Sequence, residues 1–151
     1  MENSEIEALL TDKDVKPTAV RVLVVRELAK GDVALSLSDL EGRLGSVDKS
    51  SIFRALSVFL GHHIVHRIDD GTGQSKYALW PKDSRSGQDI HHAYEDEHIH
   101  FHCERCGHTY CLPNIPLPQV ELPQGFHVHD ANMVFSGLCP DCNQRYGCKR
   151  K

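Results

Sequence analysis

The stretch from His98 to Cys106, His-Ile-His-Phe-His-Cys-Glu-Arg-Cys, decides how this chain is built. Its histidines alternate with apolar residues, and on a β-strand that alternation places the imidazoles on one face. The stretch ends in a Cys-x-x-Cys pair, and a second pair, Cys139 and Cys142, follows later in the chain. A thiolate site beside a strand lined with imidazoles indicates two metal ions. One would hold the fold together, and the fold could sense the other.

The paired cysteines predict a structural zinc site. All six cysteines lie beyond residue 102, and in a reducing cytoplasm such pairs favour a metal over disulfides. Each pair wraps one edge of a tetrahedral ion, and zinc binding gives a small domain about 10–16 kcal/mol of apparent folding free energy. Disulfides or a redox pair fit these spacings less well. We expect one Zn²⁺ per chain, bound by Cys103, Cys106, Cys139 and Cys142.

Length and charge limit the other readings. The chain has 151 residues, enough for one domain or two small ones, and a net charge of −4 that argues against a general polyanion binder. Residues 1–80 hold 10 basic and 12 acidic side chains, so any nucleic-acid contact must come from a local patch. No apolar run is long enough to span a bilayer, and the acidic N-terminus lacks a signal-peptide core. We expect a soluble, cytoplasmic protein without a membrane partner.

The first 80 residues predict a winged helix-turn-helix domain. Apolar residues at helical spacing and residues that cap helices indicate four helices, and the third helix has two candidate caps, Ser36 and Ser38. A glycine-containing turn joins the last two helices, as in a helix-turn-helix. Two short alternating segments then form a hairpin, the wing. The predicted helices are 4–11, 19–30, about 37–44 and 49–60, and the predicted strands are 64–68 and 75–79.

The remaining residues predict a hinge and a second domain. Residues 81–97 are polar, with Pro, Gly, Ser and charge, and read as a hinge. We expect strands at 98–103 and 108–112, and prolines that discourage a long helix before Gly125. Loose alternation over 126–135 predicts another strand. The basic tail 143–151 is expected to fray.

The fourth predicted helix carries the candidate DNA-reading face. Ser50, Phe53, Arg54 and Ser57 fall together, opposite the apolar residues that pack on the other helices. An arginine suits guanine or phosphate, and a phenylalanine suits thymine methyls in the major groove. Alternatively, Phe53 packs on a neighbour and Arg54 is ordinary surface. The hairpin that follows favours the DNA interpretation.

The histidine strand predicts a second, exchangeable metal site. His98 and His100, two residues apart on one strand face, can chelate one ion but need further ligands. The candidates are His66 on the wing, Cys111, and His91 or His92 in the hinge. A site that spans wing, hinge and strand would couple metal occupancy to the angle between the domains, because the ion binds one arrangement better than the other.

Taken together, these motifs resemble the ferric uptake regulator superfamily of bacterial metal-responsive repressors. The resemblance covers nearly the whole chain. It rests on Thr18 and Arg21, Ser51-Ile52-Phe53-Arg54, Gly61 with Ile64-Val65, Gly73-Gln74-Ser75-Lys76-Tyr77, His98-x-His100-x-x-Cys103-x-x-Cys106-Gly107, and Gly137-Leu138-Cys139-x-x-Cys142.

The resemblance implies an α+β fold and a homodimer. An N-terminal winged helix would read a palindromic duplex, and a C-terminal zinc-stabilised α/β domain would dimerise. An exchangeable metal at the hinge favours DNA binding in this family. Here Ala34 and Ala78 replace two hinge ligands, and Ile99 and Ala131 leave the third family site without ligands. His66 falls where zinc-sensing members place an aspartate, Cys111 falls where iron-type members place a glutamate, Phe53 lacks the usual tyrosine hydroxyl, and the prolines replace a long helix.

We therefore predict a metal-dependent transcriptional repressor, not an enzyme. Imidazole and thiolate ligands favour Zn²⁺ over Fe²⁺ as the exchangeable metal. An iron-, haem- or peroxide-responsive regulator and a zinc-ribbon protein-interaction module are the alternatives. A zinc deaminase fits less well, because Leu138 precedes Cys139 and four cysteines leave no open position for water. The predicted DNA contacts are Lys16, Thr18, Arg21, Lys49, Ser50, Ser51, Phe53, Arg54 and Ser57.

Overall fold

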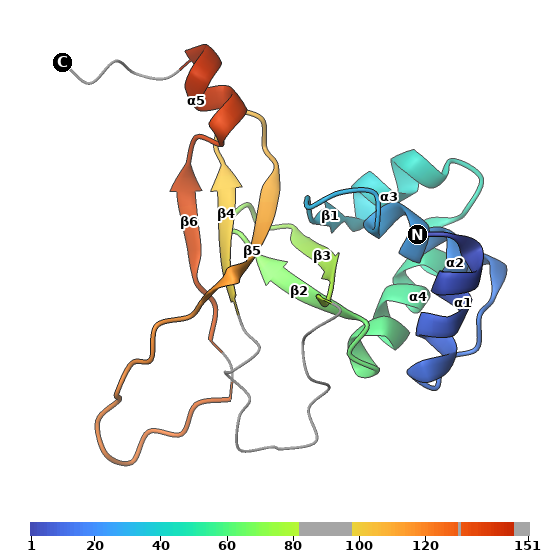
Figure 1. Cartoon of the computed structure of the whole chain (residues 1–151), viewed down its shortest axis with the longest axis horizontal. Helices are drawn as coiled ribbons and strands as arrows, with labels where there is room; N and C mark the ends of the chain where they lie inside the picture. Colours follow the sequence, from blue (N-terminus) through green and yellow to red (C-terminus); the bar gives the residue numbers. More distant parts are fainter. Residues whose placement is uncertain (82–97, 130, 147–151) are drawn as a thin grey trace. The chain divides into compact units, whose positions relative to one another are not determined.

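The computed structural model describes residues 1–81, 98–129 and 131–146 (Figure 1). The chain divides into two compact units, which we call the N-terminal unit, Met1–Trp80, and the C-terminal unit, Pro81–Lys151. The predicted hinge lies outside the described residues except for Pro81, and so do His91, His92 and Cys148. Among the described residues, no helix is long and apolar enough to cross a membrane.

The N-terminal unit contains the four predicted helices and the predicted hairpin. The hairpin strands β2 and β3 pair along their whole length, and the short strand β1, which the sequence did not predict, extends the antiparallel sheet in the order β1-β3-β2. The elements are α1 (Asn3–Asp12), α2 (Ala19–Leu28), β1 (Leu35–Ser36), α3 (Leu37–Leu44), α4 (Lys49–Gly61), β2 (Val65–Asp69) and β3 (Ser75–Leu79).

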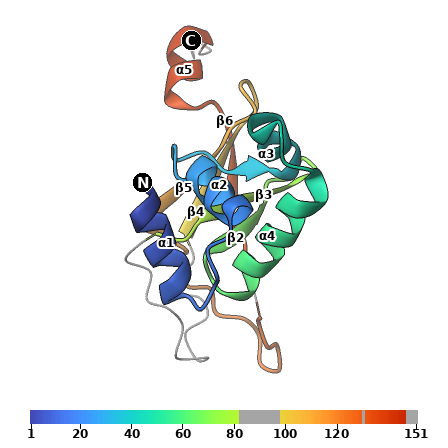
Figure 2. The ribbon, with the colours of Figure 1, turned by 90° about the vertical axis from the view of Figure 1, so that its right-hand side faces the viewer.

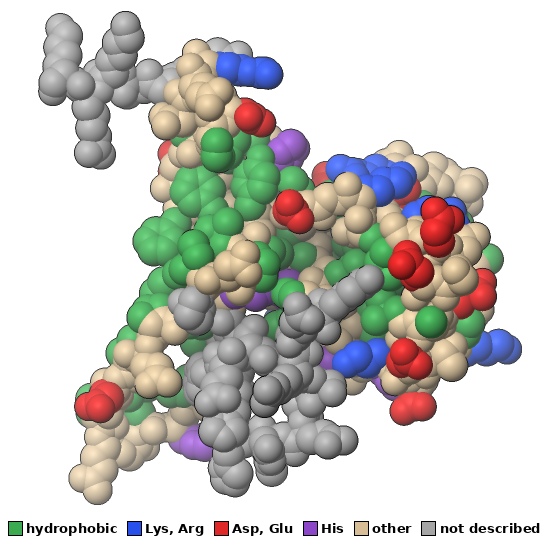
Figure 3. Space-filling model, in the orientation of Figure 1, with side chains coloured by type: hydrophobic (Ala, Val, Ile, Leu, Met, Phe, Trp, Pro, Cys, Tyr) green, Lys and Arg blue, Asp and Glu red, His purple; other side chains and the backbone are tan. Residues whose placement is uncertain are grey.

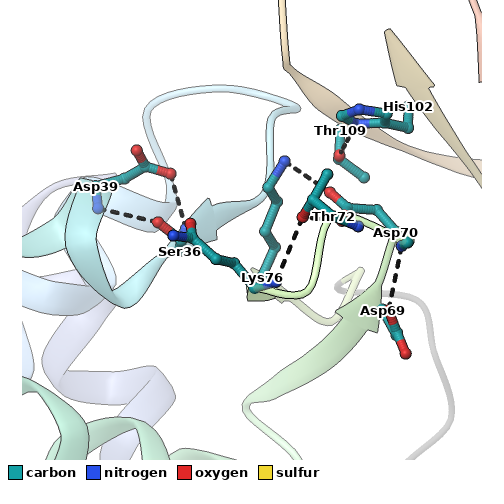
Figure 4. Close-up of polar contacts among 10 residues, drawn as sticks. Ser36, Asp39, Asp69, Asp70, Thr72, Lys76, His102 and Thr109 are labelled. Carbon is teal, nitrogen blue, oxygen red and sulfur yellow. Dashed lines mark hydrogen bonds and ion pairs between the residues drawn. The ribbon is translucent and has the colours of Figure 1, made fainter. Parts of the chain in front are cut away.

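Side-chain caps set where these helices begin. Ser36 and Asp39 form a reciprocal capping box at α3 (Figure 4): the Asp39 N–H donates to the Ser36 hydroxyl at 3.1 Å, and the Ser36 N–H donates to the Asp39 carboxylate at 2.9 Å. The structure thus selects Ser36 over Ser38 as the cap. At α4, hydrogen bonds from Ser50 and Ser51 lower the pKa of the capping Asp48 to about 2.

The helices of the N-terminal unit bury a continuous apolar core. Helix α2 contacts α1, α3 and α4, and Figure 2 shows it between α1 and α4. Its buried residues are Val24, Val25 and Leu28, whereas Leu23, which the helical spacing placed on the buried stripe, is only half-buried. The residues completely removed from solvent include Ile6, Leu10, Leu40, Ile52 and Phe59.

An ion pair stiffens the turn between β2 and β3. The Lys76 ammonium lies 2.6 Å from the Asp70 carboxylate, whose side chain is fully buried. Asp70 also accepts hydrogen bonds from the N–H and hydroxyl of Thr72, at 3.1 and 2.5 Å (Figure 4). Gly71 and Gly73, both with φ of 82°, supply the left-handed backbone that the turn requires.

The C-terminal unit is a three-stranded sheet followed by a short helix. Strand β4 is central, antiparallel to β5 and parallel to β6. Gly107, with φ of 76°, lies in the turn between β4 and β5. The elements are β4 (His98–Cys103), β5 (Thr109–Pro116), β6 (Val134–Gly137) and α5 (Pro140–Tyr146).

Two sequence expectations for this unit are wrong. The strand predicted over 126–135 is confined to Val134–Gly137, because these are the residues that pair with β4 between His100 and Cys103. The tail predicted to fray from residue 143 instead continues the helix α5 to Tyr146. Pro140 begins that helix, a position where the missing proline N–H costs nothing.

Candidate metal centres and nucleic-acid interface

The fold brings the four paired cysteines together. Cys103 is the last residue of β4, and Cys106 lies in the turn just before Gly107. Cys139 immediately precedes α5, and Cys142 lies within its first turn. Their four sulfurs lie within 4.8 Å of one another, and those of Cys106 and Cys139 are 3.9 Å apart. A tetrahedral zinc with bonds of about 2.3 Å requires sulfurs roughly 3.8 Å apart. The cluster therefore fits a closed, four-coordinate zinc site.

Backbone N–H groups prepare this cluster to bind a cation. The N–H groups of Cys106 and Cys139 lower the pKa of Cys103 to about 6, and the Cys139 N–H donates to the Cys103 sulfur at 3.4 Å. The Cys142 N–H likewise lowers the pKa of Cys139. Burial acts in the opposite direction on Cys142 and raises the pKa of its thiol to about 12. Two sulfurs thus favour the thiolate form, and the buried third needs a cation to ionise.

A second group of donors lies on the face of β4 and β5. His100 is directly opposite Cys111 in the antiparallel register, and the His98 ring centroid lies 4.6 Å from that of His100. One ligand atom from each of these three residues lies within 4.8 Å of the others. Both imidazoles are buried. Burial, and secondarily the charge of His98, lower the pKa of His100 to about 4, so this ring is neutral and able to bind a metal at neutral pH.

The other predicted regulatory ligands do not belong to this sheet. His66 belongs to the N-terminal unit, where it is buried on β2 opposite Ala78, with its ring centroid 4.7 Å from that of Trp80. His91 and His92 lie outside the described residues. The structure therefore groups three of the six predicted ligands on one sheet, within the C-terminal unit.

Helix α4 exposes the predicted DNA-reading side chains. Phe53 is 53% exposed, and Arg54 is also exposed. The serines are less available than expected: the Ser50 and Ser51 hydroxyls donate to the capping Asp48, and the Ser57 hydroxyl donates to the Phe53 carbonyl at 2.9 Å. Phe53 and Arg54 are therefore the side chains on this face best placed to contact a partner.

A shallow hollow joins the start of α2 to this face. Its lining includes Arg21 and Arg54, and the Arg21 guanidinium also donates to the Lys16 carbonyl at 2.9 Å. The predicted residues Lys16, Lys49, Ser50 and Phe53 lie outside the lining. The whole lining consists of Thr18, Val20, Arg21, Ser51, Arg54, Ala55, Ser57 and Val58.

Tyr110 is a candidate site residue that the sequence did not single out. It lies on β5 opposite Phe101, packs against the cysteine cluster, and its hydroxyl interacts with the side chains of Cys139 and Cys106. Burial, together with these sulfurs, raises the pKa of the Tyr110 phenol. No spacing rule identifies such a residue, because it reaches the cluster through strand pairing.

Comparison with known proteins places this arrangement in a known fold. A zinc uptake regulator complexed with zinc and DNA is similar with a TM-score of 0.66 and 20% identity, over 97% of this chain and 95% of that one. The holo form of XcZur follows with 0.62 and 17%, over 95% and 99%. The Vibrio cholerae ferric uptake regulator gives 0.56 and 19%, over 88% and 98%.

The chain has the fold of the ferric and zinc uptake regulators. No family model and no curated protein matches its sequence. At these identities, the similarity to the uptake regulators establishes the architecture, a winged helix followed by a smaller α+β unit. What the chain binds must be argued from its own side chains.

Proposed function

We propose that this protein is a metal-dependent transcriptional repressor that binds DNA as a homodimer and responds to zinc. The observation that carries the proposal is the group of two imidazoles and one cysteine sulfur on β4 and β5, in a chain whose other unit is a winged helix. A metal-responsive regulator needs a DNA-binding surface and an exchangeable metal site whose ligands differ from those of its structural metal. In this proposal the winged helix and the group on β4 and β5 are these two parts, and one neighbour in fold was solved with zinc and DNA. The proposed role includes no catalysis.

In this proposal Cys103, Cys106, Cys139 and Cys142 hold one structural Zn²⁺ per chain. Four sulfurs complete the coordination of the ion and leave no position for an exchangeable ligand. This ion is therefore retained while the regulatory ion comes and goes. Support comes from the 3.9 Å separation of the Cys106 and Cys139 sulfurs and from the backbone N–H groups that lower the pKa values of Cys103 and Cys139.

The exchangeable ion binds His98, His100 and Cys111, with His66 as the ligand from the wing and His91 or His92 as its substitute. Sulfur and imidazole donors favour Zn²⁺ over Fe²⁺, which prefers more oxygen ligands. The ion can increase DNA affinity only if it binds the DNA-competent arrangement more tightly than the other arrangement. A ligand from each unit supplies that difference.

DNA binding falls to α4 and the hollow beside it. Phe53 and Arg54 face bases, and Arg21, Lys16 and Lys49 neutralise phosphates. Thr18, Ser50, Ser51 and Ser57 lie around these contacts. Two copies place their α4 helices in successive major grooves, about 34–36 Å apart on a palindrome.

A second copy of the chain is the partner that the C-terminal unit requires. Figure 3 shows hydrophobic side chains gathered on the surface of this unit. Large exposed apolar patches on soluble proteins mark interaction sites. The exposed residues are Ile115, Val120, Leu122, Phe126 and Phe135, with Phe126 and Val120 both 71% exposed.

The experiment is selection of duplexes from a random pool with zinc-loaded protein, followed by anisotropy titrations on the selected duplex. We expect a two-fold sequence and tight binding in Zn²⁺ that is lost after mild chelation while one zinc per chain is retained. The same titration with Fe²⁺ separates the zinc reading from the iron reading. Equal affinity with and without exchangeable metal would contradict the proposal, and failure to select any duplex would favour a protein-interaction module.

A further inference from the structure

The donors His98, His100 and Cys111 all belong to β4 and β5, two neighbouring strands of one sheet. Backbone hydrogen bonds between the strands therefore fix their relative positions. The spacing of these three residues does not depend on where the N-terminal unit lies. This property distinguishes them from His66, which belongs to the other unit.

The strand geometry aims the three donors at one point. Side chains directly opposite in an antiparallel pair have Cβ atoms roughly 4.5–5.5 Å apart, which describes His100 and Cys111. His98 lies two residues earlier on the same face of β4. The register shifts between His98 and Ile99, so that His98 pairs with Pro116 while Ile99 pairs with Leu112. The extra residues lie on β5, between Leu112 and Pro116, so β4 itself runs without an insertion from His98 to His100.

The donor atoms are also close enough to share an ion. They lie within 4.8 Å of one another. At a tetrahedral ion, bonds of about 2.0–2.1 Å to nitrogen and 2.3 Å to sulfur require donor atoms roughly 3.3–3.6 Å apart. Small changes in side-chain torsion close that difference, and no movement of the strands is needed.

The chemistry of the set selects a class of metal. It contains two nitrogens and a sulfur, and no carboxylate of the described residues belongs to it. Thiolate ligands select Zn²⁺ and other thiophilic ions, whereas Mn²⁺ and Fe²⁺ sites are richer in oxygen. Cys111 is therefore the residue that decides which metals compete.

We propose that the C-terminal unit captures a thiophilic divalent cation on His98, His100 and Cys111 alone, and that the His66 ligand joins only afterwards. The inference rests on the proposed function, because it assigns an order of events to the proposed regulatory site. Capture and response become separate steps. The three donors set how tightly the cation binds, and His66 sets whether the cation changes the DNA affinity.

The test uses full-length protein that retains one zinc per chain, titrated with Co²⁺ while absorption is recorded. The wild-type protein is expected to bind one Co²⁺ per chain in addition to its retained zinc, and this second metal equivalent should give a thiolate-to-cobalt charge-transfer band. His66→Ala should retain that band, with affinity reduced by no more than about 10-fold, and should lose the response of DNA binding to metal. Mutations of residues outside the direct ligand set typically lower metal affinity by about 10–100-fold. We expect a loss at the lower end of this range because His98, His100 and Cys111 remain intact.

Two further variants probe the donor set itself. Cys111→Ser should remove the charge-transfer band, and His98→Ala with His100→Ala should remove the second equivalent. Matched controls are Cys148→Ser, which removes the other cysteine outside the two pairs, and His127→Ala with His129→Ala, which removes two exposed histidines. Both controls should titrate like the wild-type protein.

The possible failures are distinguishable. If His66→Ala no longer binds Co²⁺, three donors do not suffice and the order of binding is wrong. Metal-responsive DNA binding by the wild-type protein would then leave the proposed function standing. A band that survives in Cys111→Ser overturns the assignment of the sulfur. If the wild-type protein shows the band but its DNA affinity ignores the metal, the proposed function fails and the capture site stands.

Discussion

Different kinds of core stabilise the two units of this protein. The N-terminal unit buries a core of aliphatic and aromatic residues from all four helices and the sheet, among them Leu10, Leu40 and Phe59. In the C-terminal unit a core cluster consists of Cys103, Cys139 and Cys142, with Phe101, Tyr110 and Leu138 packed against it. Side-chain burial stabilises the first unit, whereas we propose that a cation bound by the four cysteines stabilises the second. We therefore predict that the N-terminal unit keeps its fold when metal ions leave the C-terminal unit.

The largest expected effect is loss of the structural metal. Stripping zinc with a strong chelator, or replacing Cys103 by Ser, should unfold the C-terminal unit, because zinc contributes about 10–16 kcal/mol of apparent folding free energy to such a domain. Amide hydrogen exchange read unit by unit measures this loss. Protection should disappear from β4, β5 and β6 and persist in α1 to α4.

Cys148→Ser is the control for this substitution, since it removes a cysteine that belongs to neither pair. It should leave zinc content and exchange unchanged. If both units lost protection together when zinc was removed, the comparison between them would be wrong.

The next largest effect is expected from a substitution in the core of the N-terminal unit. Phe59 is completely buried in the N-terminal core, and Phe59→Ala should cost about 3–5 kcal/mol through lost burial and the cavity that remains. Denaturant unfolding measures the loss. Zinc content should stay at one per chain, because the cysteine cluster lies in the other unit. A zinc loss that tracked the destabilisation would mean that the units fold as one.

Arg54→Ala tests whether the N-terminal unit binds DNA through α4. The side chain is exposed, so its loss should spare stability and zinc content. DNA affinity should fall by about 1–3 kcal/mol, measured by anisotropy on the selected duplex, because an arginine fork on a base contributes that much. Arg26→Ala is the matched control, since Arg26 lies on α2 and bonds to Asn3. An Arg54 variant that bound DNA normally would remove α4 from the interface.

A smaller effect is expected at the start of α3. Ser36→Ala should cost about 1 kcal/mol, because it leaves the Asp39 N–H without its capping oxygen. Ser38→Ala is the matched control: this serine is exposed within the helix, and its loss should be neutral. Thermal unfolding of the zinc-loaded protein measures both variants. Equal losses would show that the cap is shared or misassigned.

Ser36 and Ser38 show which features of the fold could be predicted from the sequence. Helical periodicity and capping chemistry predicted four helices and a hairpin, because both signals are local. The choice between Ser36 and Ser38 depended on whether Leu35 and Ser36 joined a sheet as β1, which is a tertiary fact. The same holds for α2, where Val25 is buried and Leu23 is half-buried because α2 packs against three other helices.

The metal sites divide in a similar way. The cysteine pairs were predictable because two knuckles of fixed spacing can close on one ion. The grouping of Cys111 with His98 and His100 depends on the register of β5 against β4, and Tyr110 reaches the cysteine cluster through the same register. Strand register is non-local, so the sequence could name Cys111 only as one of several candidate ligands. For the same reason, the extent of β6 was overestimated.

The last expected effect is a pH dependence confined to the C-terminal unit. The pKa of His100 is about 4 in the folded chain, lowered mainly by burial, against an ordinary value of 6.5. In the unfolded chain the ring takes up its proton near 6.5, and in the folded chain it stays neutral down to about 4. Stability from this residue is therefore fully present above 6.5 and is lost as the pH falls through that window.

The measurement is denaturant unfolding of the C-terminal unit across this range, with zinc on the cysteine cluster and no exchangeable metal. His100→Gln should flatten the curve relative to the wild-type protein, because the glutamine takes up no proton. His129→Gln, at an exposed position, should leave the slope unchanged. The zinc cluster also loses stability in acid, since its thiolates must then protonate, and the difference between the two variants removes that shared contribution. The N-terminal unit, measured in the same samples, should not show this difference, because His100 lies outside it.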